Sequence, residues 1–129
     1  MFERERPKML DDFQYKMVIA IPKEIQLTKG SMAVHVSHVA VSTVEEAKKK
    51  NIKWVRSWFS EGQKKVTVQV PTIEDLTVLF HKAQNLGLPC TLVKESKKGK
   101  LPEGTITALG IGPCLNSKVN PITDDLKLL

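Results

Sequence analysis

Residues Thr28–His38 (TKGSMAVHVSH) and Gly104–Pro113 (GTITALGIGP) are the two stretches of this sequence that decide the fold. The first opens with a polar, glycine-containing segment and continues into small and apolar residues, which predicts a loop that leads into a buried helix. The second is β-branched and apolar up to its glycines, which predicts a strand that runs into a glycine turn. The two stretches together indicate a domain that contains both helices and strands.

The rest of the chain alternates between strand-like and helix-like segments. An apolar, partly β-branched run ends at Pro22, and Thr28 or Ser31 is available as the N-cap of the next helix. Thr72 followed by two acidic residues predicts another helix start. We expect helices over residues 31–50, 52–60 and 73–86, and strands over 15–21, 65–70, 90–93 and 105–109.

The order of these elements predicts the fold class. Helices that connect strands imply parallel neighbours, whereas the last two strands are joined by a loop and are expected to be antiparallel. The prediction is a single α/β domain, with three α/β/α layers on a small four-stranded mixed sheet. Residues 1–14 are predicted to be a flexible N-terminal extension and 15–129 the domain, with one helical turn near 121–126.

Composition narrows the class of protein. The chain has 129 residues, 41% of them apolar, which is enough for a core without metal or disulfide staples. It contains no apolar run of the roughly 20 residues that cross a bilayer, and its charged N-terminus lacks the apolar stretch of a secretion signal. We expect a cytoplasmic protein that does not bind membranes.

Lysine carries most of the net charge of +6. Clustered lysines suit a nucleic-acid backbone, but lysines also solvate loops and complement the C-terminal ends of helices. Both interpretations stay open for the cluster at the end of the first helix. The clusters are Lys48–Lys50 with Lys53, Lys64 with Lys65, and Lys94, Lys97, Lys98 and Lys100.

Three patterns that carry chemistry elsewhere are weak here. Gly110 and Gly112 lack the third glycine of a dinucleotide fingerprint, so we expect them to form a tight turn in which the backbone can approach a neighbour or a substrate. His35 and His38 share a helical face, but a zinc site needs three or four ligands. The alternative interpretation is that both histidines are structural groups that form hydrogen bonds within the fold. The two cysteines, Cys90 and Cys114, suggest neither a disulfide nor a nucleophile.

The two opening stretches resemble the type 2 (archaeal and eukaryotic) peptidyl-tRNA hydrolases. The usual pattern of that family is Gly-Lys-Gly-Lys followed by an apolar, small-residue helix with Ser/Ala-His, and its last core strand leads from a Thr to Leu-Gly-Ile-Gly-Pro. Residues 61–66 and 86–88 match further landmarks in the same order and spacing. The resemblance runs from Tyr15 to the C-terminus.

This resemblance implies an activity and partners. The reaction is hydrolysis of the ester that joins a peptide to the 3′-terminal ribose of tRNA, which needs an oriented water, a proton acceptor and oxyanion donors. It implies no metal and no organic cofactor, a basic surface for the tRNA acceptor end, and pairing as a homodimer. Trp54, Trp58 and Phe59 are candidates for that interface, although core packing explains them equally well.

The resemblance also implies site residues. Lys29 and Gly30 match the family motif, the family's second lysine is Ser31, and its acid falls on Glu95. We expect Glu95 to orient or deprotonate water, unless it is a loop carboxylate paired with a nearby lysine. The other expected catalytic residues are Lys29 as a cation, Thr107 as a hydrogen-bonding group and His38, the family's helix histidine. The expected substrate-binding residues are Thr28, Gly30, Ser31, His35 (usually Gln in the family), Lys64, Lys65, Lys97, Lys98, Gly110 and Gly112.

Two departures from the family pattern support rival functions. Ser31 replaces a lysine, and Gly99 replaces a threonine four residues after the acid. One rival is a catalytically weak or inactive homologue that binds tRNA or ribosomal RNA through the same basic face. Another is a protein–protein adaptor, because one fold hosts several functions.

Overall fold

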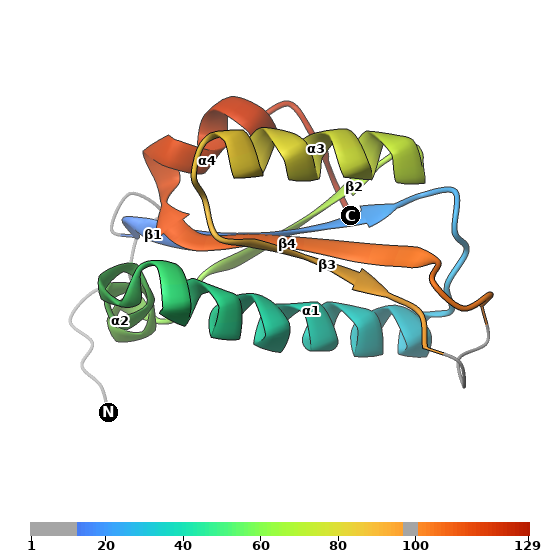
Figure 1. The fold of residues 1–129 in the computed structure, drawn as a ribbon, viewed down its shortest axis with the longest axis horizontal. Coiled ribbons are helices and arrows are strands. Elements are labelled where there is room, and N and C mark those ends of the chain that lie inside the picture. The colour runs from blue at the N-terminus through green and yellow to red at the C-terminus, as the bar shows by residue number, and fades with distance from the viewer. Residues whose placement is uncertain (1–12, 97–100) are drawn as a thin grey trace.

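The computed structural model describes residues 13–96 and 101–129, which form one sheet with helices on both faces (Figure 1). The elements follow the predicted order. The helical turn expected near residues 121–126 overlaps a longer helix that ends at Thr123, and one more strand follows. The strands are β1 (Tyr15–Pro22), β2 (Lys65–Val70), β3 (Cys90–Lys94), β4 (Ile106–Leu115) and β5 (Lys127–Leu128). The helices are α1 (Lys29–Lys50), α2 (Ile52–Glu61), α3 (Ile73–Asn85) and α4 (Asn116–Thr123).

The sheet is mixed, as predicted, but it has five strands in the order β3-β4-β1-β2-β5. β1 and β2 are parallel, and the other neighbours, including β3 and β4, are antiparallel. The prediction of four strands was wrong because β5 is only two residues long and has no periodic pattern. It is fixed by hydrogen bonds across to β2, from Leu129 N to Thr67 O and from Gln69 Nε2 to Leu128 O.

β4 is also longer than expected, and the predicted glycine turn was wrong. The strand continues through both glycines, because each of them lies where another part of the chain comes close. Gly112 has a φ of 104°, and a Cβ atom there would lie 2.7 Å from the carbonyl oxygen of Lys16 on β1. The Gly112–Pro113 peptide bond is cis.

The two helical layers divide the core into two clusters. α1 and α2 cover one face of the sheet, and α3 and α4 cover the other (Figure 1). On β1, Met17 and Ile19 belong to the cluster that contains Val39 of α1, whereas Val18 and Ala20 belong to the cluster that contains Leu76 of α3. A strand covered on both faces reads as a continuous apolar run, which is why β1 shows no alternation in the sequence.

α1 approaches the sheet most closely where a glycine faces it. Gly110 of β4 is buried, and a Cβ atom there would clash with the side chain of Thr43 and lie 3.0 Å from its Cβ. This contact lies in the C-terminal half of α1. The helix therefore extends back along the sheet from it, and its first turns lie near the end of β3 (Figure 1).

No helix in the described part of the chain combines the length and the apolar character needed to cross a bilayer.

The contact between Gly110 and Thr43 predicts the effect of a single methyl group. Gly110→Ala should lower the free energy of unfolding by about 1–3 kcal/mol, because α1 must shift to admit it. The double variant Gly110→Ala, Thr43→Ala should recover part of this loss in urea unfolding. Gly87→Ala is the control: it has φ 73° but open space around the added atom, so Thr43→Ala should not rescue it. Equal rescue of both glycine variants would contradict the contact.

Candidate active site at the start of α1

One pocket, with a volume of about 500 Å³, is lined by six of the fourteen predicted site residues. It lies between the beginning of α1 and the end of β3, with the segments before α1 and before β4 as its borders. This volume falls within the range of roughly 300–1,000 Å³ that is usual for ligand sites. Its lining residues are Gln26, Leu27, Thr28, Gly30, Ser31, Val34, His35, His38, Val93, Lys94, Glu95, Ser96 and Leu101.

The α1 side of the pocket is built on a capped helix start. The Thr28 hydroxyl oxygen accepts a hydrogen bond of 3.2 Å from Ser31 N, which confirms Thr28 as the N-cap. Ser31, His35 and His38 follow at spacings of four and three, so they lie on one side of the helix. The first turn contains no acidic residue, so the partial positive charge of the helix end is not neutralised from within the helix.

The β3 side of the pocket holds Glu95 by its backbone. Glu95 N donates to Thr105 O at 2.8 Å, and Glu95 O accepts from Gly104 N at 3.0 Å. The pairing of β3 with β4 shifts register between Val93 and Lys94, an irregularity of the kind that redirects the side chains that follow. The carboxylate itself accepts a hydrogen bond of 3.2 Å from Ser96 N through Oε1.

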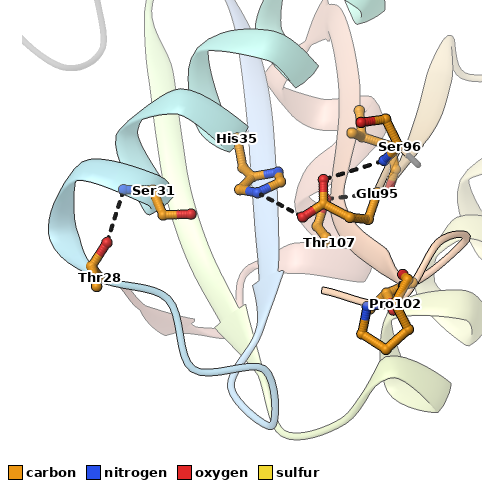
Figure 2. A network of polar contacts seen from close by, with 9 residues as sticks. Thr28, Ser31, His35, Glu95, Ser96, Pro102 and Thr107 are labelled. Carbon is orange, nitrogen blue, oxygen red and sulfur yellow. Dashed lines mark hydrogen bonds and ion pairs between the residues drawn. The ribbon is translucent and has the colours of Figure 1, made fainter. Parts of the chain in front are cut away.

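His35 and Glu95 face one another across the pocket (Figure 2). His35 Nε2 lies 4.0 Å from Glu95 Oε2, and each side chain is only 12% exposed. The two groups come from positions 60 residues apart in the chain, and neither is shielded from the cavity, because both line it. An imidazole and a carboxylate in this arrangement can bind, orient and exchange protons with a small polar molecule.

Thr107 is fully buried and lies beside Glu95 in Figure 2. Its hydroxyl donates to Val93 O at 3.4 Å, and among the described residues no hydrogen bond joins it to Glu95. Thr107 is absent from the residues that line the pocket. In this structure it therefore ties β4 to the end of β3, directly before the segment that carries Glu95.

The remaining predicted residues that the structure describes lie outside the pocket lining. Lys29 is exposed at the first residue of α1, between two lining residues. Lys64 and Lys65 lie at the other end of the sheet, where Lys65 Nζ is 5.0 Å from the centre of the Trp58 ring. Gly110 and Gly112 are buried in β4 and serve packing. Lys97, Lys98 and Gly99 fall outside the described residues, as does Lys100.

The sequence patterns missed one charged residue of the pocket. Lys94 is exposed on its rim, next to Glu95, and was grouped only with the other lysines of its cluster. The available signal was that Lys94 directly precedes Glu95, because residues at the end of one strand lie at the same edge of the sheet. The other lining residues that were missed carry no charge: Gln26, Leu27, Val34, Val93, Ser96 and Leu101.

The cysteines are poor nucleophiles. Burial raises the pKa of Cys114 to about 12, and burial also raises the pKa of Cys90, so both thiols stay protonated near neutral pH. Within residues 13–96 and 101–129, no three His, Cys, Asp or Glu side chains are grouped so as to hold a metal ion.

The candidate interface aromatics have different environments. Trp58 is buried and its Nε1 donates to Lys64 O at 2.8 Å, whereas Trp54 packs partly buried against the core. Phe59 is 45% exposed, beside the exposed Val41 of α1. Two of the three aromatics thus serve the core, and the homodimer stays a prediction.

The cap at Thr28 predicts a local effect on the pocket. Thr28→Ala should cost about 1 kcal/mol of unfolding free energy and speed amide hydrogen exchange in the first turn of α1. Thr28→Ser should keep both properties near wild type, because the accepting oxygen is retained. Thr72→Ala, which removes the cap of α3, is the matched control and should leave exchange in α1 unchanged. Unchanged amide exchange in Thr28→Ala would contradict the role of this cap in holding the first turn of α1 beside the pocket.

Comparison with known proteins identifies the family. A family model described as Peptidyl-tRNA hydrolase PTH2 matches residues 15–129. The chain is similar to the peptidyl-tRNA hydrolase of Thermococcus onnurineus, at 40% identity over 117 residues that cover 91% of this chain and 99% of the relative. It is also 40% identical over 121 residues to that of Staphylothermus marinus, and 39% over 114 residues to that of Methanocaldococcus jannaschii. These alignments cover 94% and 88% of this chain and 100% and 99% of the two relatives. The chain therefore belongs to the Peptidyl-tRNA hydrolase PTH2 family.

Proposed function

We propose that this chain hydrolyses the ester bond of peptidyl-tRNA and releases the peptide and free tRNA. One observation carries the proposal: in a member of this family, a single pocket combines a carboxylate, an imidazole and an uncompensated helix N-terminus. Ester hydrolysis needs a group that handles water and donors that stabilise the developing oxyanion. The pocket contains candidates for both.

Glu95 is the carboxylate that orients the attacking water. Its backbone is held by two hydrogen bonds to the 104–105 segment, so its side chain starts from a fixed position. Only one of its oxygens accepts a hydrogen bond from a described residue, namely Oε1 from Ser96 N. Oε2, on the His35 side, is left to act on groups within the pocket.

The N-terminus of α1 is suited to the oxyanion. The first N–H groups of a helix have no partner within the helix, and the helix dipole favours negative charge there. Gly30 lines the pocket, and nothing lies within 4 Å of where its Cβ would be, so a ligand can come close to the backbone. Ser31 lines the pocket beside it, and this position carries a hydroxyl rather than a family lysine.

The tRNA end requires positive charge near the pocket. Lys94 and Lys29 are both exposed. Lys94 lies on the rim at the β3 side of the pocket, and Lys29 lies at the start of α1, next in sequence to residues that line the other side. Lysines that neutralise phosphates raise affinity in a salt-dependent way. We therefore propose that the acceptor end enters between these two residues.

The carboxylate is tested by a matched pair of variants. Glu95→Gln should lower kcat for an N-blocked aminoacyl-tRNA by about 10²-fold, because the charge that orients water is lost. Glu103→Gln is the control, since this exposed carboxylate follows Leu101 closely but does not line the pocket. The wild type should hydrolyse unblocked aminoacyl-tRNA much more slowly than the blocked form. Binding of tRNA without any release would overturn the proposed activity.

The rim lysine is tested by salt dependence. Lys94→Ala should raise KM for the blocked substrate and reduce the slope of log KM against log salt by about 1, because one phosphate contact is lost. Lys82→Ala on the exposed face of α3 removes the same charge away from the pocket and should leave the slope unchanged. Equal slopes in all three proteins would remove Lys94 from the tRNA site.

A further inference from the structure

His35 occupies a position that a structural histidine does not need. Its ring faces the pocket, its side chain is 12% exposed, and its one polar contact among the described residues is the approach of Nε2 to Glu95 Oε2 at 4.0 Å. A histidine that served only the fold would have hydrogen-bond partners in neighbouring elements. Here the contact group is itself part of the pocket wall.

We propose that His35 is the general base of the hydrolysis and that Glu95 is its positioning residue. This inference rests on the proposed function. It adds that the proton of the attacking water goes to the imidazole, so that Glu95 orients the water through His35.

The orientation of the ring supports this division of roles. A carboxylate opposite Nε2 favours the tautomer that carries its hydrogen on Nε2 and leaves Nδ1 as the acceptor. Nδ1 has no hydrogen-bond partner within residues 13–96 and 101–129, which leaves its lone pair free to accept a hydrogen bond from water, and His35 lines the pocket. The separation of 4.0 Å is longer than a hydrogen bond, and such contacts commonly shorten when substrate is bound.

The other titratable groups around His35 are few. His38 lies on the same helix, and Lys94 and Glu95 face His35 from the end of β3; the segment before α1 and Leu101 contribute uncharged lining residues. His38 is exposed and no described residue forms an ion pair with it, so it lacks the orienting group that His35 has. Of these two histidines, which are three residues apart, only His35 therefore has a group that orients its ring.

His35 Nδ1 takes a proton from water while the water oxygen bonds to the ester carbonyl carbon, which forms a tetrahedral oxyanion near the start of α1. The intermediate collapses and breaks the bond between the acyl carbon and the ribose oxygen. That oxygen takes the proton from the imidazolium, so water and ester become a peptide carboxylic acid and a free ribose hydroxyl.

The test is the pH dependence of kcat/KM for N-blocked aminoacyl-tRNA between pH 5 and 8, in wild type and in single variants. The wild-type rate should rise with pH, because a general base acts in its deprotonated form. His35→Gln should lower kcat by about 10²–10³-fold and abolish the rise. Glu95→Gln should be slower but keep the rise, because the imidazole is still present. His38→Gln should also keep it.

Controls separate a chemical role from a folding defect. His81→Gln on α3 should match wild type in rate and pH profile, because this exposed ring lies on the opposite helical layer. Added imidazole should partly restore turnover in His35→Ala if the protein is folded, as checked by urea unfolding.

Three results would overturn the inference. They are a His35→Gln profile that keeps the wild-type rise, a loss of the rise in His38→Gln, and folded His35→Ala that imidazole does not rescue. If wild type releases no peptide, the proposed function fails instead.

Discussion

The close packing of α1 against β4 is the constraint on which the site depends. Because Gly110 has no side chain, Thr43 can lie directly against the strand, and this contact holds the C-terminal half of a helix of 22 residues against the sheet. A helix rises about 1.5 Å per residue, so the twelve residues from Ser31 to Thr43 span roughly 18 Å. The position of the pocket is therefore set by a contact well away from it. The residue that packs α1 against β4 and the pocket residues Ser31, His35 and His38 share one helix.

The fold was largely predictable because its main elements carry local signals. β2 matches its expected range, and Thr28 and Thr72 both cap helices as expected. The errors lie at the C-terminal end of the fold. β4 continues through two glycines, since these residues admit neighbours rather than turn the chain, and α4 contains Pro121, which is atypical of a helix interior. β5 exists only because β2 offers it an edge, and no local pattern encodes such pairing.

The candidate site was predictable in part, for a physical reason. The family resemblance assigned Thr28, Ser31, His35 and His38 to the site, and helical spacing places the last three on one side of α1. The approach of Glu95 to His35 depends on how β3 ends and on the irregular pairing at Val93 and Lys94, which periodicity does not describe. Lys64 and Lys65 were grouped with the site by charge alone, yet charge does not determine which end of a sheet a residue occupies. The family resemblance identified Glu95 as a site residue, and the structure shows that its side chain lies beside His35.

The short strand β5 has a consequence for the integrity of the whole sheet. Leu128 and Leu129 complete hydrogen bonds along β2, which would otherwise be a bare outer strand. A bare outer strand is a template on which a second polypeptide can stack. The pairing with β5 therefore covers an edge at which a second polypeptide could otherwise pair. Replacing the pairing residues of β5 would expose the edge of β2 and leave the candidate pocket, at the other side of the sheet, unchanged.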